Sequence, residues 1–441
     1  LNNHDLFIDT IQKITTMLPE KMRVLCGFIF VYFIISAFDA FLIIYIPLYY
    51  FEILNVDRAV LAFVQLISYF TLFILPLFGI IYDIAVKKVS QTNGLLFISF
   101  IPLCGGFLIF LFFKENLLLY GIYIVLSFIS KSLIRTGMTG IFLDYVKGEN
   151  NEKNPKRKIY IIISSNCASA CSFLYVSLFF NLYVVDITSL SAWNLFFFTV
   201  WVFSIPLIIF VLHFFKSTNI QREIVGKSEE KKIISASREI IITVLLFLSV
   251  FFSFSDALFS YPKSSWIRET YSAPAFRLYS SLYFLFQICS LAGYMVFFYL
   301  GKKYDDRKIL LVFTIIFSPM MLLSVMYGFL VFIIFTALMF FIGNVINLTY
   351  ISYSTDFSIK TKYKTFMYFL LQSPSSLASI IFIPLGTFFS LYIHFETLVM
   401  ITTLLYMLSI FFIILSLLVK KAENKEVIEL PVDSIEISQV T

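Results

Sequence analysis

The chain has 441 residues, of which 60% are hydrophobic and 14% charged, and its formal net charge is +6. A soluble domain is about 45–50% apolar and about 25% charged, so this composition excludes a soluble enzyme and a disordered scaffold. The basic residues are divided among many short loops, which excludes nucleic acid as a partner. The length instead fits about a dozen spans of roughly 20 residues in a lipid bilayer.

Long apolar runs along the chain predict twelve transmembrane helices. Helices are expected because lipid offers no partner to an open backbone, and because the runs are too long for barrel strands. The predicted spans are 24–51, 59–82, 91–113, 117–146, 159–185, 193–215, 240–262, 273–300, 309–327, 329–355, 365–389 and 395–419.

Lys and Arg set the expected orientation. With the N-terminus inside, 26 of the 33 Lys and Arg residues fall in cytoplasmic segments and five in external loops. Since cytoplasmic loops carry an excess of basic residues, both termini are predicted to be cytoplasmic, in a multi-pass protein of the cell membrane.

The longest polar stretch between spans, 216–239, is a cytoplasmic linker that divides the chain into two halves, 24–215 and 240–419. The segments outside the halves are a cytoplasmic N-terminal segment, 1–23, and a polar cytoplasmic tail, 420–441, which we expect to be disordered.

Three landmarks recur in the same order in both halves, at offsets of 217, 222 and 212 residues. A duplicated set of landmarks is typical of transporters that bind their substrate between two related bundles. The predicted fold class is therefore an all-α membrane protein with twelve transmembrane helices in two pseudo-symmetric six-helix bundles. The paired landmarks are Asp39 with Asp256, Gly79–Asp83 with Gly301–Asp305, and Asp144 with Asp356.

The two loops that follow the second and eighth spans share the form G-x-x-Y-D followed by basic residues. This form resembles motif A of the major facilitator superfamily, although Ile84 replaces its first base and Val86 its second glycine. The resemblance in span count, loop motif and repeat covers nearly the whole chain. The matching residues are Gly79, Asp83, Lys87 and Lys88 in the first half and Gly301, Asp305, Arg307 and Lys308 in the second.

The residues themselves suggest what the first loop does. Gly79 permits close helix approach, and Asp83 can accept hydrogen bonds from the N-terminus of a neighbouring helix. The resemblance implies a cytoplasmic latch that stabilises the outward-facing state. The implied ion pairs join Lys87 or Lys88 to Asp144, and Arg307 or Lys308 to Asp356; positive-inside topology with simple helix caps is the alternative.

Four ionisable residues lie inside the predicted spans. Asp39 and Asp256 are expected to face the central cavity or a partner, because exposing them to lipid is costly. Lys131 and Arg135 are four residues apart and share a helix face. Arg135 also opens a run of small residues that resembles motif B of the same superfamily. The charges of the four sum to zero, so the sign of the substrate does not follow.

We hypothesise that Asp39 pairs with Arg135 and that protonation of Asp39 releases the pair, as the resemblance to proton-coupled sugar symporters implies. The chemistry is suitable because Arg stays charged while Asp titrates. A static ion pair, or a substrate-binding Arg135 without proton coupling, are the alternatives.

A proline follows each intramembrane aspartate, Pro47 in the first half and Pro262 in the second. Proline has no N–H to donate, so each is expected to loosen the outer end of its helix. The resemblance implies an outer gate at these ends, and ordinary helix termination is the alternative.

Several amides also lie inside spans. They are candidates for hydrogen bonds to a polar solute in the cavity, although contacts between helices are the more common role of such groups. The candidate cavity residues are Asn344, Asn347, Gln287 and Gln372.

The predicted function is secondary transport of a small solute by alternating access, with proton symport favoured. A facilitative uniporter or an exporter of the same fold is the alternative; a transport-inactive sensor and a membrane-embedded enzyme are rivals of other classes. No catalytic residue, metal site or cofactor is expected, because no phosphate-binding loop and no metal-ligand spacing occur. The expected partners are the solute, protons and the bilayer, and the expected state is a monomer.

Overall fold

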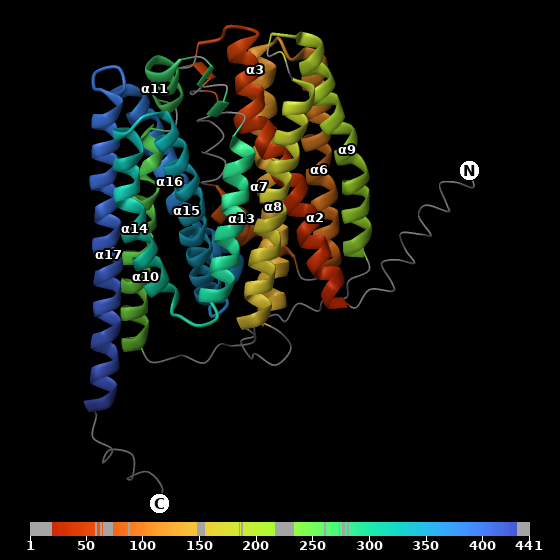
Figure 1. Ribbon diagram of the computed structural model, residues 1–441. Coiled ribbons are helices and arrows are strands. Elements are labelled where there is room, and N and C mark those ends of the chain that lie inside the picture. Colours follow the sequence, from red (N-terminus) through yellow and green to blue (C-terminus); the bar gives the residue numbers. More distant parts are fainter. Residues whose placement is uncertain are drawn as a thin grey trace, which may run out of the picture.

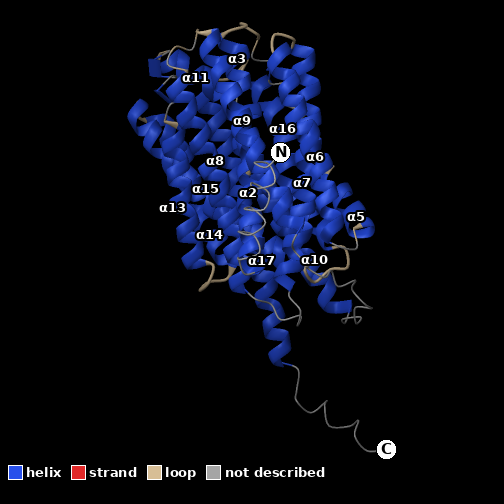
Figure 2. Cartoon of the chain, turned by 90° about the vertical axis from the view of Figure 1, so that its right-hand side faces the viewer, coloured by secondary structure: helices blue, strands red, loops and turns tan. Residues whose placement is uncertain are grey.

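The computed structural model describes residues 20–57, 60–61, 64, 74–86, 89–147, 155–184, 186, 188–216, 233–259, 262–272, 274–275, 278–279 and 282–429. Every regular element in this part of the chain is helical (Figure 2). The predicted all-α class is therefore confirmed.

The helices of the two halves occupy opposite sides of the molecule (Figure 1). The elements of the first half are α2 (Glu20–Ala40), η1 (Phe41–Tyr45), α3 (Ile46–Glu52), α5 (Leu75–Ala85), α6 (Val89–Phe113), α7 (Leu117–Lys147), α8 (Pro155–Tyr183) and α9 (Leu190–Lys216). The elements of the second half are α10 (Ile233–Ser253), η2 (Ser255–Phe259), α11 (Pro262–Tyr271), α13 (Tyr283–Leu300), α14 (Asp306–Met326), α15 (Phe329–Ser358), α16 (Lys364–Phe389) and α17 (Phe395–Glu429).

Helix length and hydropathy match the predicted spans. Among the described residues, eight helices are long and apolar enough to cross a membrane, and four shorter apolar helices lie at the predicted first, second, sixth and eighth spans. We call the end of the bundle that carries Glu20 and the last turns of α17 the inner face (Figure 1).

The first and seventh predicted spans are not regular α-helices throughout. The π-helical element η1 follows Asp39 closely and includes position 43, whose carbonyl lacks an i+4 donor because Pro47 has no N–H. In the second half α10 ends at Ser253, and Asp256 lies in the 3-10 helix η2. Both intramembrane aspartates therefore lie where the helix geometry changes.

Three boundaries differ from the prediction. Pro262 does not end the seventh span but opens the separate helix α11, where a missing N–H costs nothing. Helix α10 begins at Ile233, inside the predicted linker. Helix α17 continues past position 419 to Glu429, so the first part of the predicted disordered tail is helical, and 430–441 lie outside the described residues.

Two seams join the halves: α5 packs on α16, and α8 packs on α13. These are the second with the eleventh span and the fifth with the eighth. Exchanging the halves converts the second span into the eighth and the eleventh into the fifth, so each seam is the symmetry counterpart of the other. The predicted pair of pseudo-symmetric bundles is confirmed by this exchange.

Candidate functional site

Asp39 lies on α2 against two cations of α7, and we call these three residues the Asp39 cluster. Lys131 Nζ donates to Asp39 Oδ1, and Arg135 Nη2 donates to Asp39 Oδ2 at 3.0 Å. Both carboxylate oxygens are therefore engaged. The Lys131 ammonium also lies 3.5 Å from the centre of the Phe128 ring, a cation–π contact.

Exposure differs sharply within the Asp39 cluster. The side chain of Lys131 is 2% exposed and that of Asp39 10%, whereas that of Arg135 is 34% exposed. The expected contact between Asp39 and Arg135 is present, and the coupling role assigned to it stays a prediction. The contact from Lys131 was not predicted, although its four-residue spacing from Arg135 is the signal that could have indicated it.

Ser132 and Thr136, which lie beside these cations on α7, are buried and make hydrogen bonds within the helix. Ser132 Oγ donates to the Phe128 carbonyl and Thr136 Oγ1 to the Ser132 carbonyl, each at 2.7 Å. The long side chains of Lys131 and Arg135 therefore reach Asp39 on α2, while these hydroxyls stay paired within α7.

A cavity of about 300 Å³ lies within the second half, between α10, η2, α11, α14, α15 and α17. Asp256 of η2 and Lys263 of α11 both line it, so the second intramembrane aspartate shares its surroundings with a cation. Lys263 is one of the five basic residues that the predicted topology assigns to external loops, and it lies on α11. The remaining polar lining consists of Ser253, Thr336, Asn344, Asn347, Tyr350 and Tyr406.

The four predicted cavity amides divide into two groups. Asn344 and Asn347 line the second-half cavity, and Asn344 also donates to Ser290 Oγ at 2.8 Å and accepts from Tyr294 at 3.2 Å. Gln372 lies outside this lining and donates to Ser354 Oγ at 3.0 Å, a contact between α16 and α15. Gln287 is buried on α13 and does not line this cavity.

Asp83 caps a helix of the opposite half at the inner face. Helix α16 begins at Lys364, and its own N-cap residue Tyr363 makes no capping hydrogen bond. Asp83 Oδ2 accepts from the backbone N–H of Thr365 at 2.9 Å and of Phe366 at 3.1 Å. A capping side chain normally accepts from these N2 and N3 positions, so Asp83 does for α16 what a local N-cap residue usually does.

Gly79, one turn before Asp83, makes this approach possible. A Cβ atom there would lie 2.9 Å from the backbone N and Cα of Phe366. Only glycine fits at this position between α5 and α16, and the predicted close approach of the two helices is present.

Two ion pairs cross between the halves at the inner face, and they are related by the same exchange as the seams. Lys364 Nζ lies 3.1 Å from Asp144 Oδ1, and Lys158 Nζ lies 2.8 Å from Asp356 Oδ2. In each pair, an aspartate near the end of one helix meets a lysine at the start of a helix in the other half.

The observed partner of Asp356 differs from the one that the resemblance implied, and Asp144 has a partner, Lys364, that was not predicted. The expected contact of Arg307 or Lys308 with Asp356 does not form among the described residues; Asp356 binds Lys158 instead. Lys87 and Lys88 lie outside the described residues, so their predicted contact with Asp144 stays a prediction. Lys158 and Lys364 belong to basic loops that the sequence showed, but the interpretation used those loops only for topology.

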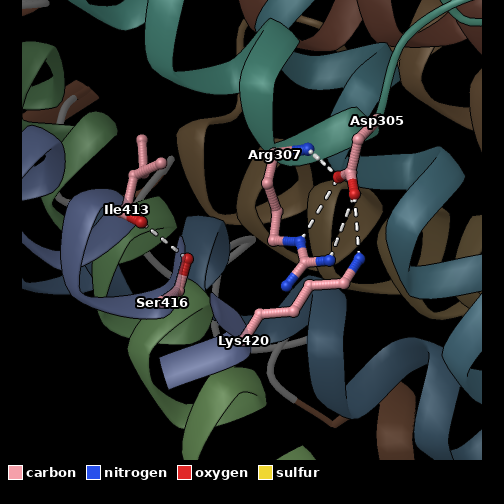
Figure 3. A network of polar contacts seen from close by, with 5 residues as sticks. All are labelled: Asp305, Arg307, Ile413, Ser416 and Lys420. Atoms are coloured by element: carbon pink, nitrogen blue, oxygen red, sulfur yellow. Dashed lines mark hydrogen bonds and ion pairs between the residues drawn. The ribbon is translucent and has the colours of Figure 1, made fainter. Parts of the chain in front are cut away.

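Asp305, the counterpart of Asp83, caps its own helix (Figure 3). Its Oδ1 accepts from the Arg307 N–H at 3.0 Å, and its Oδ2 contacts Arg307 Nη2 at 3.2 Å and Lys420 Nζ of α17 at 3.0 Å. Burial opposes ionisation of Asp305, but the Arg307 N–H and the charges of Lys420 and Arg307 outweigh it and lower the pKa of Asp305 to about 2. Gly301 ends α13 and contacts its own helix.

Within the described residues, no group of three or more His, Cys, Asp or Glu side chains is arranged to hold a metal ion.

The arrangement of helices is that of known transporter structures. The outward conformation of the transporter FucP covers 91% of this chain and 99% of its own, with a TM-score of 0.64 and 16% identity. A bacterial homologue of the iron transporter ferroportin, in an outward-facing state, covers 90% and 99% with a TM-score of 0.63 and 14% identity. The human organic anion transporter MFSD10 covers 90% and 100% with a TM-score of 0.61 and 12% identity.

At these identities the similarity defines the fold and no more. The chain has the fold of the major facilitator superfamily. The sequence itself matches no protein-family model and no curated protein.

Proposed function

We propose that this chain is a secondary transporter that moves a small solute across a cell membrane by alternating access. The observation that carries the proposal is a set of polar contacts between the halves at the inner face, each of which can break: the Asp83 cap on α16 and the pairs of Asp144 with Lys364 and of Asp356 with Lys158. Opening these contacts, while the outer side closes, exposes the region between the halves to the other side of the membrane. Both termini face the cytoplasm in this proposal.

Proton coupling through Asp39 is the energetic part of the proposal. While Asp39 is ionised, its two oxygens neutralise Lys131 and Arg135 in part, and its proton uptake removes the counter-ion of both cations. Arg135, the most exposed member, then becomes available to a ligand or to movement of α7. Uniport remains the second candidate, because a carboxylate held by two cations also makes a stable static pair.

The test uses the full chain in liposomes, with radiolabelled sugars, organic acids, amino acids and peptides screened by counterflow. We expect one class to exchange, and a pH gradient, acidic on the side that corresponds to the outer face, to drive its accumulation. Asp39→Asn is expected to abolish accumulation and to leave counterflow within about twofold.

The matched control is Glu269→Gln, which removes an exposed carboxylate on α11 and should change neither activity. Accumulation that persists in Asp39→Asn would refute the coupling, and absence of counterflow for all classes would refute transport.

A further inference from the structure

The Asp39 cluster carries more positive than negative charge. Its two cations share one carboxylate, so it bears one net positive charge while Asp39 is ionised. The charges of Asp39, Asp256, Lys131 and Arg135 sum to zero, so the sequence alone does not indicate the sign of the solute's charge. The structure separates them, because Asp256 lines the second-half cavity together with Lys263 and is not part of the Asp39 cluster.

Arg135 is the member of the Asp39 cluster that a ligand can reach. Lys131 is 2% exposed, with its ammonium held between Asp39 and the Phe128 ring. The Arg135 side chain is 34% exposed, and a guanidinium has five N–H donors, of which those on Nη2 serve Asp39. Free donors of Arg135 therefore remain for a bidentate contact with a carboxylate.

The surroundings of Arg135 come from both halves. Helix α16 of the opposite half packs on α7, and its Tyr368 packs against the same core cluster, formed mainly by the first half, as Tyr32 of α2 does. The charge of Arg135 reaches both phenols. The Tyr368 phenol can donate an O–H to an anionic oxygen, whereas the Tyr32 phenol is engaged by Thr139.

We propose that the transported solute is a small carboxylate, bound by Arg135 on the side of α7 where Tyr368 of α16 lies, and that a proton on Asp39 accompanies it. The inference rests on the proposed transport function. Asp39 Oδ2 takes the proton from water on the outer side, and this breaks its ionic contact with Arg135 Nη2. The carboxylate replaces the lost counter-ion, because two unneutralised cations are costly in a low dielectric. Proton and anion then leave together on the inner side, so no net charge crosses the membrane.

No other charge competes for this role among the described residues near Asp39. The charged groups that act on Asp39 are Lys131 and Arg135, both on α7. Helices α8 and α9 also pack along α2 and add no charged group to that pair. The charge of Arg135 also acts on the phenols of Tyr32 and Tyr368.

The experiment measures ligand binding to the purified full chain by the shift of its melting temperature, at pH 5.5 and 7.5. The probes are lactate, benzoate, succinate and inorganic phosphate, each organic acid matched with its amide, and benzylamine as a cation. We expect at least one carboxylate to raise the melting temperature with a Kd about tenfold or more lower at pH 5.5, while its amide has no effect.

Two variants assign the effect to this site. Arg135→Gln is expected to weaken carboxylate binding at least tenfold, and Tyr368→Phe, which removes only a hydroxyl, several-fold. The control Lys303→Gln removes an exposed positive charge from the inner face, where its ammonium lies near the Tyr304 ring of the same loop, and should leave the Kd unchanged.

Three outcomes would overturn the inference: no anion in the panel binds, an amide or benzylamine binds as tightly as the acid, or both site variants retain the wild-type Kd. Asp39-dependent accumulation of an uncharged solute would leave the proposed transport function intact and refute only the carboxylate. Carboxylate binding without counterflow of any solute would refute transport and not the site.

Discussion

Asp83 and Asp305 occupy the same position in the two halves, and each carboxylate accepts from the N-terminus of a helix. Asp83 caps α16, which belongs to the other half, whereas Asp305 caps α14, which follows it directly in the chain. The tyrosines that precede them differ too, since Tyr82 is buried with its hydroxyl 3.0 Å from Thr92 Oγ1, and Tyr304 is 47% exposed.

This difference shows that the two copies of a duplicated motif can make different contacts and so have different structural roles. The first loop closes a seam between halves, so its contacts must break whenever the inner face opens. In the second loop, Asp305 is held within its own half by Lys420 of α17, so the contacts of Asp305 can persist through the cycle. Four predictions test this contrast between the two loops.

The largest effect is expected at the ion pairs that cross between the halves. Asp144 and Lys364 are 8% and 7% exposed, whereas Asp356 is 45% exposed in its pair with Lys158. Removing one partner of a buried pair costs about 3–5 kcal/mol, and an exposed pair contributes about 1 kcal/mol or less. We expect Asp144→Asn to shift the population away from the closed inner face by about a hundredfold, and Asp356→Asn by about fivefold or less.

The measurement is the distance distribution between spin labels at Ala85 and Lys308, in a chain whose five cysteines are replaced. The exchange of charges in Asp144→Lys with Lys364→Asp should restore much of the closed population. Equal shifts for the Asp144 and Asp356 variants would show that burial does not distinguish the two pairs.

An intermediate effect is expected at Gly79. In Gly79→Ala the new Cβ would meet the Phe366 backbone at 2.9 Å, and such overpacking costs about 1–3 kcal/mol. We therefore expect about a tenfold loss of the closed state, read from the same spin labels.

Gly94 offers the matched control, because a Cβ there meets nothing within 4 Å. Gly301→Ala extends the comparison to the second loop, where the nearest atom is the Phe297 carbonyl of the same helix at 3.0 Å, so only α13 should adjust. A shift with Gly301→Ala as large as that with Gly79→Ala would contradict the contrast between the loops.

The smallest effect is expected for the aspartates themselves. Asp83→Asn weakens the charge–dipole contact with α16, worth about 1 kcal/mol, and should shift the closed population about fivefold. Asp305→Asn keeps a good N-cap residue and should shift it less than twofold, while lowering the melting temperature slightly.

The pH dependence of the melting temperature tests the contacts assigned to Asp305. Because the folded-state pKa of Asp305 is lowered to about 2, below the unfolded value of about 3.9, its stabilising contacts are present above about pH 4 and are lost as the pH falls towards 2. The difference in melting temperature between the wild type and Asp305→Asn should therefore be constant from pH 7 to about pH 5 and disappear near pH 2. A difference that already disappears at pH 5 would contradict the assigned contacts.

The charged residues show how far sequence reasoning reaches. The cost of a charge in lipid predicted that Asp39 would have a partner or face the cavity, and the resemblance to proton-coupled sugar symporters implied that the partner is Arg135. The Asp83 cap followed from the preference of a carboxylate for a helix N-terminus. The break of the seventh span at Ser253 was missed because the serine-rich stretch before Pro262 was interpreted as continuous helix. The partners Lys158 and Lys364 were missed because the basic residues of these loops were used only to predict the orientation of the chain in the membrane.

The sequence by itself determined the twelve helices and the charges placed inside them. Hydropathy and span length are local properties, and a bilayer imposes them on each segment separately. Only the tertiary structure decided which half Asp83 would cap, which lysine each inner aspartate would bind, and that Asp256 and Lys263 would be separated from the Asp39 cluster. These contacts join residues up to 283 positions apart, so they depend on how the two bundles pack side by side in the membrane, which no local property of the sequence sets.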